Sequence, residues 1–117
     1  MALDNFQGTR DIILQTNSKD VPYSFTFTVN SSATANDGAL PFGTNVSTAV
    51  VTAHIAETGV ADSEIVANSS VGSNVVTVDM TYPSTNGVNW YHLTFVLTLD
   101  NGAILEFDYN RVYVEDR

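Results

Sequence analysis

Strict alternation of apolar and polar residues near the end of the chain constrains its fold more than any other feature. In residues 91–99 every second side chain is apolar, and histidine or threonine fills three of the four positions between them. A period of two indicates a strand with one buried face. The turn Asp100-Asn101-Gly102 follows, and an Asn-Gly pair supplies the positive φ angles of a tight hairpin. Residues 90–115 are therefore predicted to form an antiparallel hairpin.

The second arm of this hairpin changes phase along its length. Its apolar residues first occupy odd positions and then even positions: Leu105, Phe107, Tyr109, Val112 and Val114. One unpaired residue inserted near Asn110-Arg111 would turn both sets toward the same face. We therefore predict a β-bulge at this point of the last strand.

Five further segments carry strand patterns, and turns rich in Gly, Pro, Asn and Ser separate them. Residues 23–29 and 74–82 alternate strictly, whereas residues 49–57 are apolar on both faces, which indicates a central strand. Shorter strands are expected at residues 11–16 and 63–67, and no segment has a helical period. The predicted fold class is all-β, a two-sheet antiparallel β-sandwich of immunoglobulin-like type with about seven strands.

Residues 30–48 form an unusually long connection, which is small and polar apart from Leu40-Pro41-Phe42. Connections of this length inside a compact domain tend to be either functional or mobile. Leu40 and Phe42 either plug the edge of the sandwich or present an apolar tip to a partner. Both interpretations are kept open.

Residues 1–10 show neither period and are interpreted as an N-terminal arm ahead of a single domain at residues 11–117. In an isolated domain such an arm is normally frayed. In an assembly, Leu3 and Phe6 could dock on a neighbouring molecule. The candidate partner-binding residues are therefore Leu3, Phe6, Leu40, Pro41 and Phe42.

Composition excludes several classes of partner. Thirteen acidic residues against four basic ones give a net charge of −9, which repels nucleic acid and anionic membranes. No cysteine is present, so disulfides do not hold the fold. The N-terminus lacks an apolar run preceded by basic residues, which predicts a protein made in the cytoplasm.

The sequence offers little catalytic or metal-binding chemistry. His54 and His92 lie on strand positions without ligand spacing, and no Gly-x-Ser-x-Gly elbow is present. A weak calcium site at the hairpin is conceivable from three carboxylates, those of Asp100, Glu106 and Asp108. The expectation is a protein without enzymatic activity and without a cofactor or bound metal.

Aromatic residues give one alternative binding mode. Trp90, Tyr109 and Tyr113 could stack against a small molecule or glycan if they converge on an open face. The alternation instead directs most aromatic side chains inward, and Trp90 and Tyr91 are expected to anchor the core.

The order of these segments resembles that of small immunoglobulin-like structural proteins of tailed bacteriophages. The resemblance rests on an early strand pair, a middle strand, and a closing hairpin with Trp90-Tyr-His-Leu-Thr-Phe at its start and Arg111-Val-Tyr-Val114 at its end. It covers most of the chain. It implies a virion protein that acts by adhesion to other virion proteins, either the major capsid protein or tail proteins.

The function expected from this resemblance is that of a non-enzymatic decoration or cement subunit on a capsid lattice. A tail or baseplate module and a glycan-binding sandwich are the alternatives. Exposed strand edges can pair with a second copy, so a homo-oligomer is expected.

Overall fold

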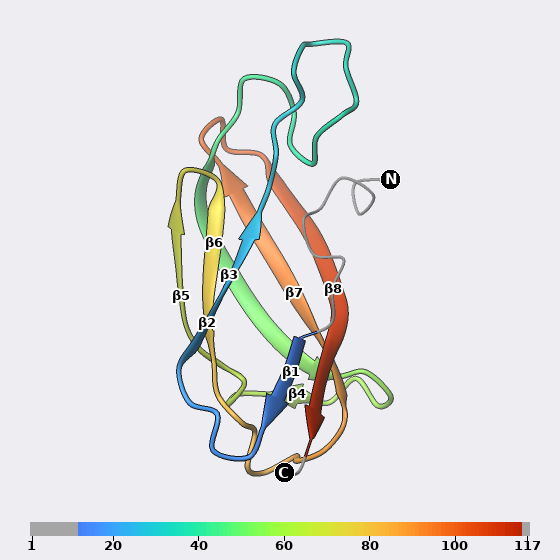
Figure 1. The fold of residues 1–117 in the computed structure, drawn as a ribbon. Coiled ribbons are helices and arrows are strands. Elements are labelled where there is room, and N and C mark those ends of the chain that lie inside the picture. The colour runs from blue at the N-terminus through green and yellow to red at the C-terminus, as the bar shows by residue number, and fades with distance from the viewer. Residues whose placement is uncertain (1–11, 116–117) are drawn as a thin grey trace.

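Eight strands build the computed structural model, which describes residues 12–115 (Figure 1). The strands are β1 (Ile12–Gln15), β2 (Val21–Thr26), β3 (Val46–Ile55), β4 (Ala61–Asp62), β5 (Val66–Gly72), β6 (Val75–Met80), β7 (Trp90–Leu99) and β8 (Ile104–Glu115). Among these residues there is no helix with the length and apolarity needed to span a membrane.

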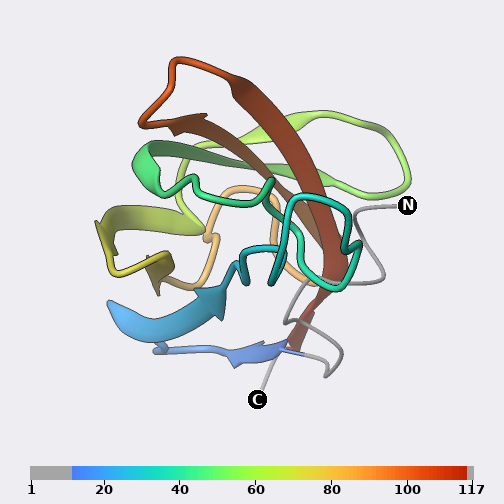
Figure 2. The same cartoon turned by 90° about the horizontal axis from the view of Figure 1, so that it is seen from above.

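The strands form two sheets that face each other (Figure 2). One sheet has the order β1-β8-β7-β3-β4 and the other has the order β2-β6-β5. Immunoglobulin domains show the same arrangement, in which strands B, E and D oppose strands G, F, C and C′. The predicted immunoglobulin-like sandwich is confirmed. One pairing departs from the antiparallel expectation, because β1 runs parallel to β8.

The hairpin of β7 and β8 forms as the alternation predicts, with Phe95 opposite Phe107 and Leu97 opposite Leu105. The turn differs from the expectation in one detail. Of Asn101 and Gly102, only Gly102 has a positive φ, at 87°. Gly102 N donates to Leu99 O at 3.0 Å and Leu99 N donates to Ala103 O at 2.8 Å, which is the pattern of a three-residue turn ending in a left-handed glycine.

The predicted bulge in the last strand is confirmed. Tyr91 pairs with Val112 and Leu93 pairs with Tyr109, so two steps along β7 correspond to three steps along β8. The additional residue lies at Asn110-Arg111, which are both exposed. Because of this insertion, the two predicted sets both face the core: Leu105, Phe107 and Tyr109 before the bulge, and Val112 and Val114 after it.

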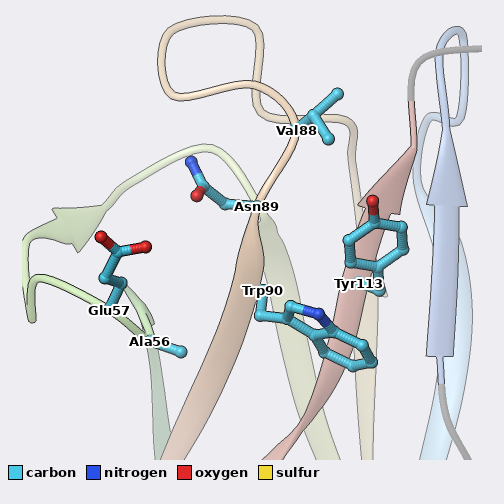
Figure 3. A pocket seen from close by; sticks show the side chains of 6 residues that line it. All are labelled: Ala56, Glu57, Val88, Asn89, Trp90 and Tyr113. Carbon is cyan, nitrogen blue, oxygen red and sulfur yellow. The ribbon is translucent and has the colours of Figure 1, made fainter.

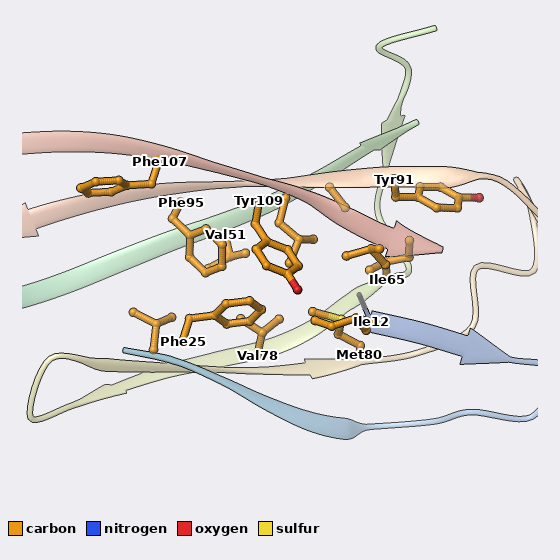
Figure 4. Close-up of a cluster of buried hydrophobic side chains, with 14 of the residues drawn as sticks. Ile12, Phe25, Val51, Ile65, Val78, Met80, Tyr91, Phe95, Phe107 and Tyr109 are labelled. Carbon is orange, nitrogen blue, oxygen red and sulfur yellow. The ribbon is translucent and has the colours of Figure 1, made fainter. Parts of the chain in front are cut away.

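Aromatic rings from both sheets meet in the centre of the core (Figure 4). Phe95 of β7 lies 4.8 Å from Phe25 and 5.6 Å from Phe27, measured between ring centroids. Tyr109 packs edge-on against Phe25 at 5.1 Å, and Phe107 lies 5.2 Å from Phe27. Tilted and edge-to-face pairs of this kind add to the stabilisation that burial alone provides.

One predicted strand is misplaced. A strand was expected at residues 63–67 and a loop after it, but Ile65 lies between strands with a fully buried side chain, and β5 occupies Val66–Gly72. The polar Asn-Ser-Ser segment forms a strand because its backbone pairs with β6 at the edge of the sheet. Ser73 and Asn74, with φ of 51° and 64°, supply the tight turn that brings β5 back along β6.

Tyr91 at the start of β7 joins the core to the preceding turn. Its side chain is fully buried, and its hydroxyl donates to the carbonyl oxygen of Gly87 at 2.6 Å. A tyrosine that hydrogen-bonds to the backbone just upstream, at the start of this strand, is a hallmark of immunoglobulin domains. Burial, together with the negative charge of Asp62, raises the pKa of Tyr91 to about 12.

Replacing Tyr91 with phenylalanine should destabilise the fold by about 1–3 kcal/mol, because the Gly87 carbonyl loses its donor. In the native chain the raised pKa favours the neutral phenol. Its stabilising contribution is therefore complete below pH 10 and is lost as the pH rises toward 12. Urea unfolding at pH 9 and 11.5 measures both effects. If the free energy of unfolding falls equally between pH 9 and pH 11.5 in the native chain and in Tyr91→Phe, the neutral Tyr91 hydroxyl does not stabilise the fold.

Candidate binding surfaces

The connection between β2 and β3 folds back on itself at one end of the sandwich. Ala39 N and Leu40 N both donate to Thr28 O, at 2.8 and 2.9 Å, and Asn30 N donates to Leu40 O at 2.9 Å. At Gly38 a Cβ atom would lie 2.6 Å from the backbone carbon of Val29, so only glycine allows this close approach. The connection is therefore an ordered structure and ends at residue 45, because β3 begins at Val46.

Side-chain hydrogen bonds close the outer part of this connection. Asn30 Oδ1 accepts from Gly38 N at 2.7 Å, and the Asp37 carboxylate accepts from Ser31 N at 2.9 Å and from Ser31 Oγ at 2.7 Å. The bonds from the backbone and side chain of Ser31 lower the pKa of Asp37. Residues 30–38 are thus a closed polar lobe that precedes the apolar segment.

The apolar segment separates into one buried and two exposed residues. Leu40 is 0% exposed and packs in the core, which confirms the plug interpretation for this side chain. It is therefore withdrawn as a partner-binding candidate, because it has no surface to offer. Pro41 is exposed and Phe42 is 55% exposed, and we call these two residues the loop tip. Leu3 and Phe6 lie outside the described residues.

A set of polar side chains ties three loops together at the end of the sandwich where β3 begins. The Asp100 carboxylate accepts from Asn45 N and Asn45 Nδ2, and Asp100 N donates to Asn45 O at 2.9 Å. Asn74 Nδ2 donates to Asn45 Oδ1 at 3.1 Å, and Asn74 Oδ1 accepts from Val46 N at 2.7 Å. This network fixes where β3 begins and, with it, the position of the loop tip.

A second apolar surface lies at the opposite end of the sandwich. Trp90 is 48% exposed, which corrects the expectation that it anchors the core, and its ring lies 4.8 Å from that of Tyr113 (Figure 3). The register places Ile13 beside Tyr113, and Ile13 is also exposed. With the exposed Val88, these side chains form what we call the aromatic patch: Ile13, Val88, Trp90 and Tyr113.

Carboxylates hold the turn that carries Val88 and Trp90. The Glu64 carboxylate accepts from Ser84 Oγ at 2.7 Å and from Thr85 N at 2.8 Å, and these bonds lower the pKa of Glu64. The buried Asp62 accepts from Asn86 Nδ2 at 2.7 Å and from Ile65 N at 2.8 Å. The aromatic patch therefore stands on a turn with fixed geometry.

A groove of about 550 Å³ borders the aromatic patch, lined by Ala56, Glu57, Val88, Asn89, Trp90 and Tyr113. Its lining combines a carboxylate and an amide with two aromatic rings, and in Figure 3 Glu57 and Asn89 lie on one side of β7 and the rings on the other. Such a combination can stack on an apolar face and hydrogen-bond to polar groups. Tyr109 does not take part, because it is buried in the core.

The carboxylates considered for calcium do not form a cluster. Asp100 is engaged by Asn45, and Asp108 accepts from Thr94 Oγ1 at 2.9 Å. Glu106 lies opposite Val96 on the outer face of the sheet. Within residues 12–115 no group of three or more His, Asp or Glu side chains is placed to hold a metal ion.

Sequence reasoning missed residues that come together only through strand pairing. The aromatic patch joins β1, β7, β8 and the turn before β7, and only the register could have shown this. Similarity to known proteins does not identify either surface, because no protein-family model matches this chain and no curated protein or solved structure gives a significant match.

Proposed function

We propose that this chain is a non-enzymatic structural protein of a tailed-phage virion that binds a capsid lattice as a decoration or cement subunit. The observation that carries this proposal is an exposed apolar surface at each end of an elongated sandwich of 47 × 22 × 21 Å (Figure 1). The loop tip lies at one end and the aromatic patch at the other. A subunit that cements a lattice must contact two neighbours, and two separated surfaces suit that task.

The residue types at both ends suit contacts between proteins. Tryptophan and tyrosine are enriched among the side chains that dominate binding energy at interfaces. Trp90 and Tyr113 already lie against each other, so little side-chain freedom remains to be lost on binding. The Asn45, Asn74 and Asp100 network similarly holds the loop tip in place. Rigid apolar surfaces favour adhesion over the conformational change that many enzymes require.

The net charge and the exposed strand edges indicate which kinds of partner the chain can bind. A net charge of −9 favours a basic protein surface over nucleic acid. Each sheet also has edges where backbone groups can pair with another strand, since β5 and β2 border the smaller sheet. β4 pairs with only two residues of β3, Ala53 and His54. Pairing at these edges would produce the expected homo-oligomer or extend a partner's sheet.

The loop tip provides the sharpest test of this proposal. Phe42→Ser should reduce cosedimentation of the purified chain with heads of the phage that encodes it, because the variant removes the main apolar side chain of the tip. Its thermal unfolding should remain close to that of the native chain, since surface substitutions usually change stability by less than about 0.5 kcal/mol.

The matched control is Thr34→Ala, which changes another exposed residue of the same connection. It should leave both cosedimentation and stability unchanged. Undiminished binding of Phe42→Ser to the heads would remove the loop tip from the interface. Tails used in place of heads distinguish the decoration role from the alternative of a tail or baseplate module.

A second candidate function is glycan binding in the groove beside Trp90. The observation that favours it is the combination of two aromatic rings with the Glu57 carboxylate and the Asn89 amide. Sugar rings offer an apolar face for stacking and hydroxyls for hydrogen bonds. Binding of the purified chain to an oligosaccharide array, abolished by Trp90→Ala, would select this function over adhesion to virion proteins.

A further inference from the structure

We propose that His54 and His92 form a binding site for a divalent transition-metal ion on the outer face of the five-stranded sheet. The two residues are 38 positions apart in the sequence but directly opposite each other on β3 and β7. Their ring centroids lie 5.8 Å apart at an interplanar angle of 45°. Both side chains are half-buried, so a metal ion can reach them from solvent.

The distance between the rings suits coordination of one ion by both residues. Metal–nitrogen bonds to histidine are about 2.0–2.1 Å long, which places two imidazole centroids on one tetrahedral ion about 5 Å apart. The observed separation exceeds this by less than about 1 Å, and rotation of the two side chains supplies the difference. The backbones need not move, because the paired strands already fix the two residues at neighbouring positions.

The surroundings leave the imidazole nitrogens available. Within residues 12–115 neither ring forms a hydrogen bond. Along β3 and β7 the neighbouring positions on the same face carry Thr52 and Thr94 on one side and Ala56 and Trp90 on the other. Across the sheet, Ala61 of β4 lies opposite His54, and the exposed bulge of β8 at Asn110-Arg111 lies across from His92. None of these neighbouring residues on β3 and β7 has a carboxylate, so water molecules would complete the coordination of the metal ion. Such a site selects ions that prefer imidazole, with Cu²⁺ bound more tightly than Zn²⁺ or Ni²⁺.

The composition of the chain makes this site unusually easy to test. His54 and His92 are its two histidines, and it contains no cysteine. Trp90 is its single tryptophan and lies two residues before His92 on β7, about 7 Å away along the strand. A bound Cu²⁺ ion should therefore quench tryptophan fluorescence, and its imidazole ligands can come only from this pair.

The experiment is a titration of the untagged protein with CuCl₂, followed by Trp90 fluorescence and by electron paramagnetic resonance. We expect saturable quenching at one ion per chain and a spectrum that reports two nitrogen ligands. His54→Ala and His92→Ala should each weaken binding about tenfold or more, because one preorganised ligand of two is lost. Thr52→Ala, an exposed neighbour on the same face, should bind Cu²⁺ as the native chain does.

Two results would overturn the site. The first is quenching that does not saturate or that exceeds one ion per chain. The second is unchanged affinity in His54→Ala and His92→Ala, which would assign the bound ion to surface carboxylates. Both variants alter half-exposed residues, so circular dichroism should show that they fold like the native chain. The site is independent of the proposed virion role, and neither result bears on adhesion.

Discussion

Phe95→Ala is expected to destabilise the protein by about 3–5 kcal/mol, which is the largest effect of any substitution considered. The side chain of Phe95 is fully buried, and its ring packs against Phe25 of β2 in the opposite sheet and against Phe27, which follows β2. Its removal leaves a cavity at the point where the two sheets meet. Since domains of this size are stable by about 5–15 kcal/mol, the loss would be a large fraction of the total.

Chemical denaturation of the native chain and the variant measures this effect. The matched control is Val96→Ala, because Val96 is the next residue on β7 and points to the outer face. It should cost less than about 1 kcal/mol. If Phe95→Ala does not fold, Phe95→Leu provides a milder change at the same position. If Phe95→Ala lowers the free energy of unfolding no more than Val96→Ala does, the side chain of Phe95 does not pack between the two sheets.

Leu40→Ala is expected to cost about 2–5 kcal/mol, the second largest effect. Leu40 is part of a connection without regular secondary structure, yet its side chain is fully buried in the core. Its backbone is fixed by the bonds to Thr28 and Asn30, so the site cannot easily collapse around the cavity.

Comparison of Leu40→Ala with Phe42→Ser separates the two roles of this segment. Thermal unfolding should show a large loss of stability for Leu40→Ala and almost none for Phe42→Ser, although only one residue lies between them. Equal losses for both would mean that Phe42 also packs in the core in solution. If both variants instead unfold at the temperature of the native chain, Leu40 does not close the end of the sandwich.

Local periodicity explains why most strands could be predicted from the sequence. Alternation over residues 91–99 marks the buried face of β7 without any knowledge of its partners. The change of phase after Tyr109 located the bulge, because only an inserted residue lets Val112 face the same side. In both cases the burial pattern lies within a single strand.

Features that depend on pairing between distant segments could not be predicted in this way. β5 is a polar edge strand whose formation depends on β6, and the parallel pairing of β1 with β8 leaves no local signal. The facing of His54 and His92 and the assembly of the aromatic patch follow from register alone. The loop tip is similar: without a period, nothing in the sequence shows which of Leu40 and Phe42 turns inward.

The hydrogen bond of Tyr91 could be predicted only in part from the sequence. Its apolar neighbours predicted that the ring would be buried, and burial of a phenol requires a partner for its hydroxyl. A turn rich in Gly, Pro, Asn and Ser was also predicted between residues 74–82 and the final hairpin. Only the folded geometry, with Gly87 at a φ of 65°, places that carbonyl oxygen within reach of the hydroxyl.

Mass spectrometry of gradient-purified virions tests most directly the proposal that this sandwich functions by adhesion within a virion. The proposal predicts that the chain copurifies with heads in a fixed ratio to the major capsid protein. Absence of the chain from purified virions, when it is present in the lysate, would contradict the proposal.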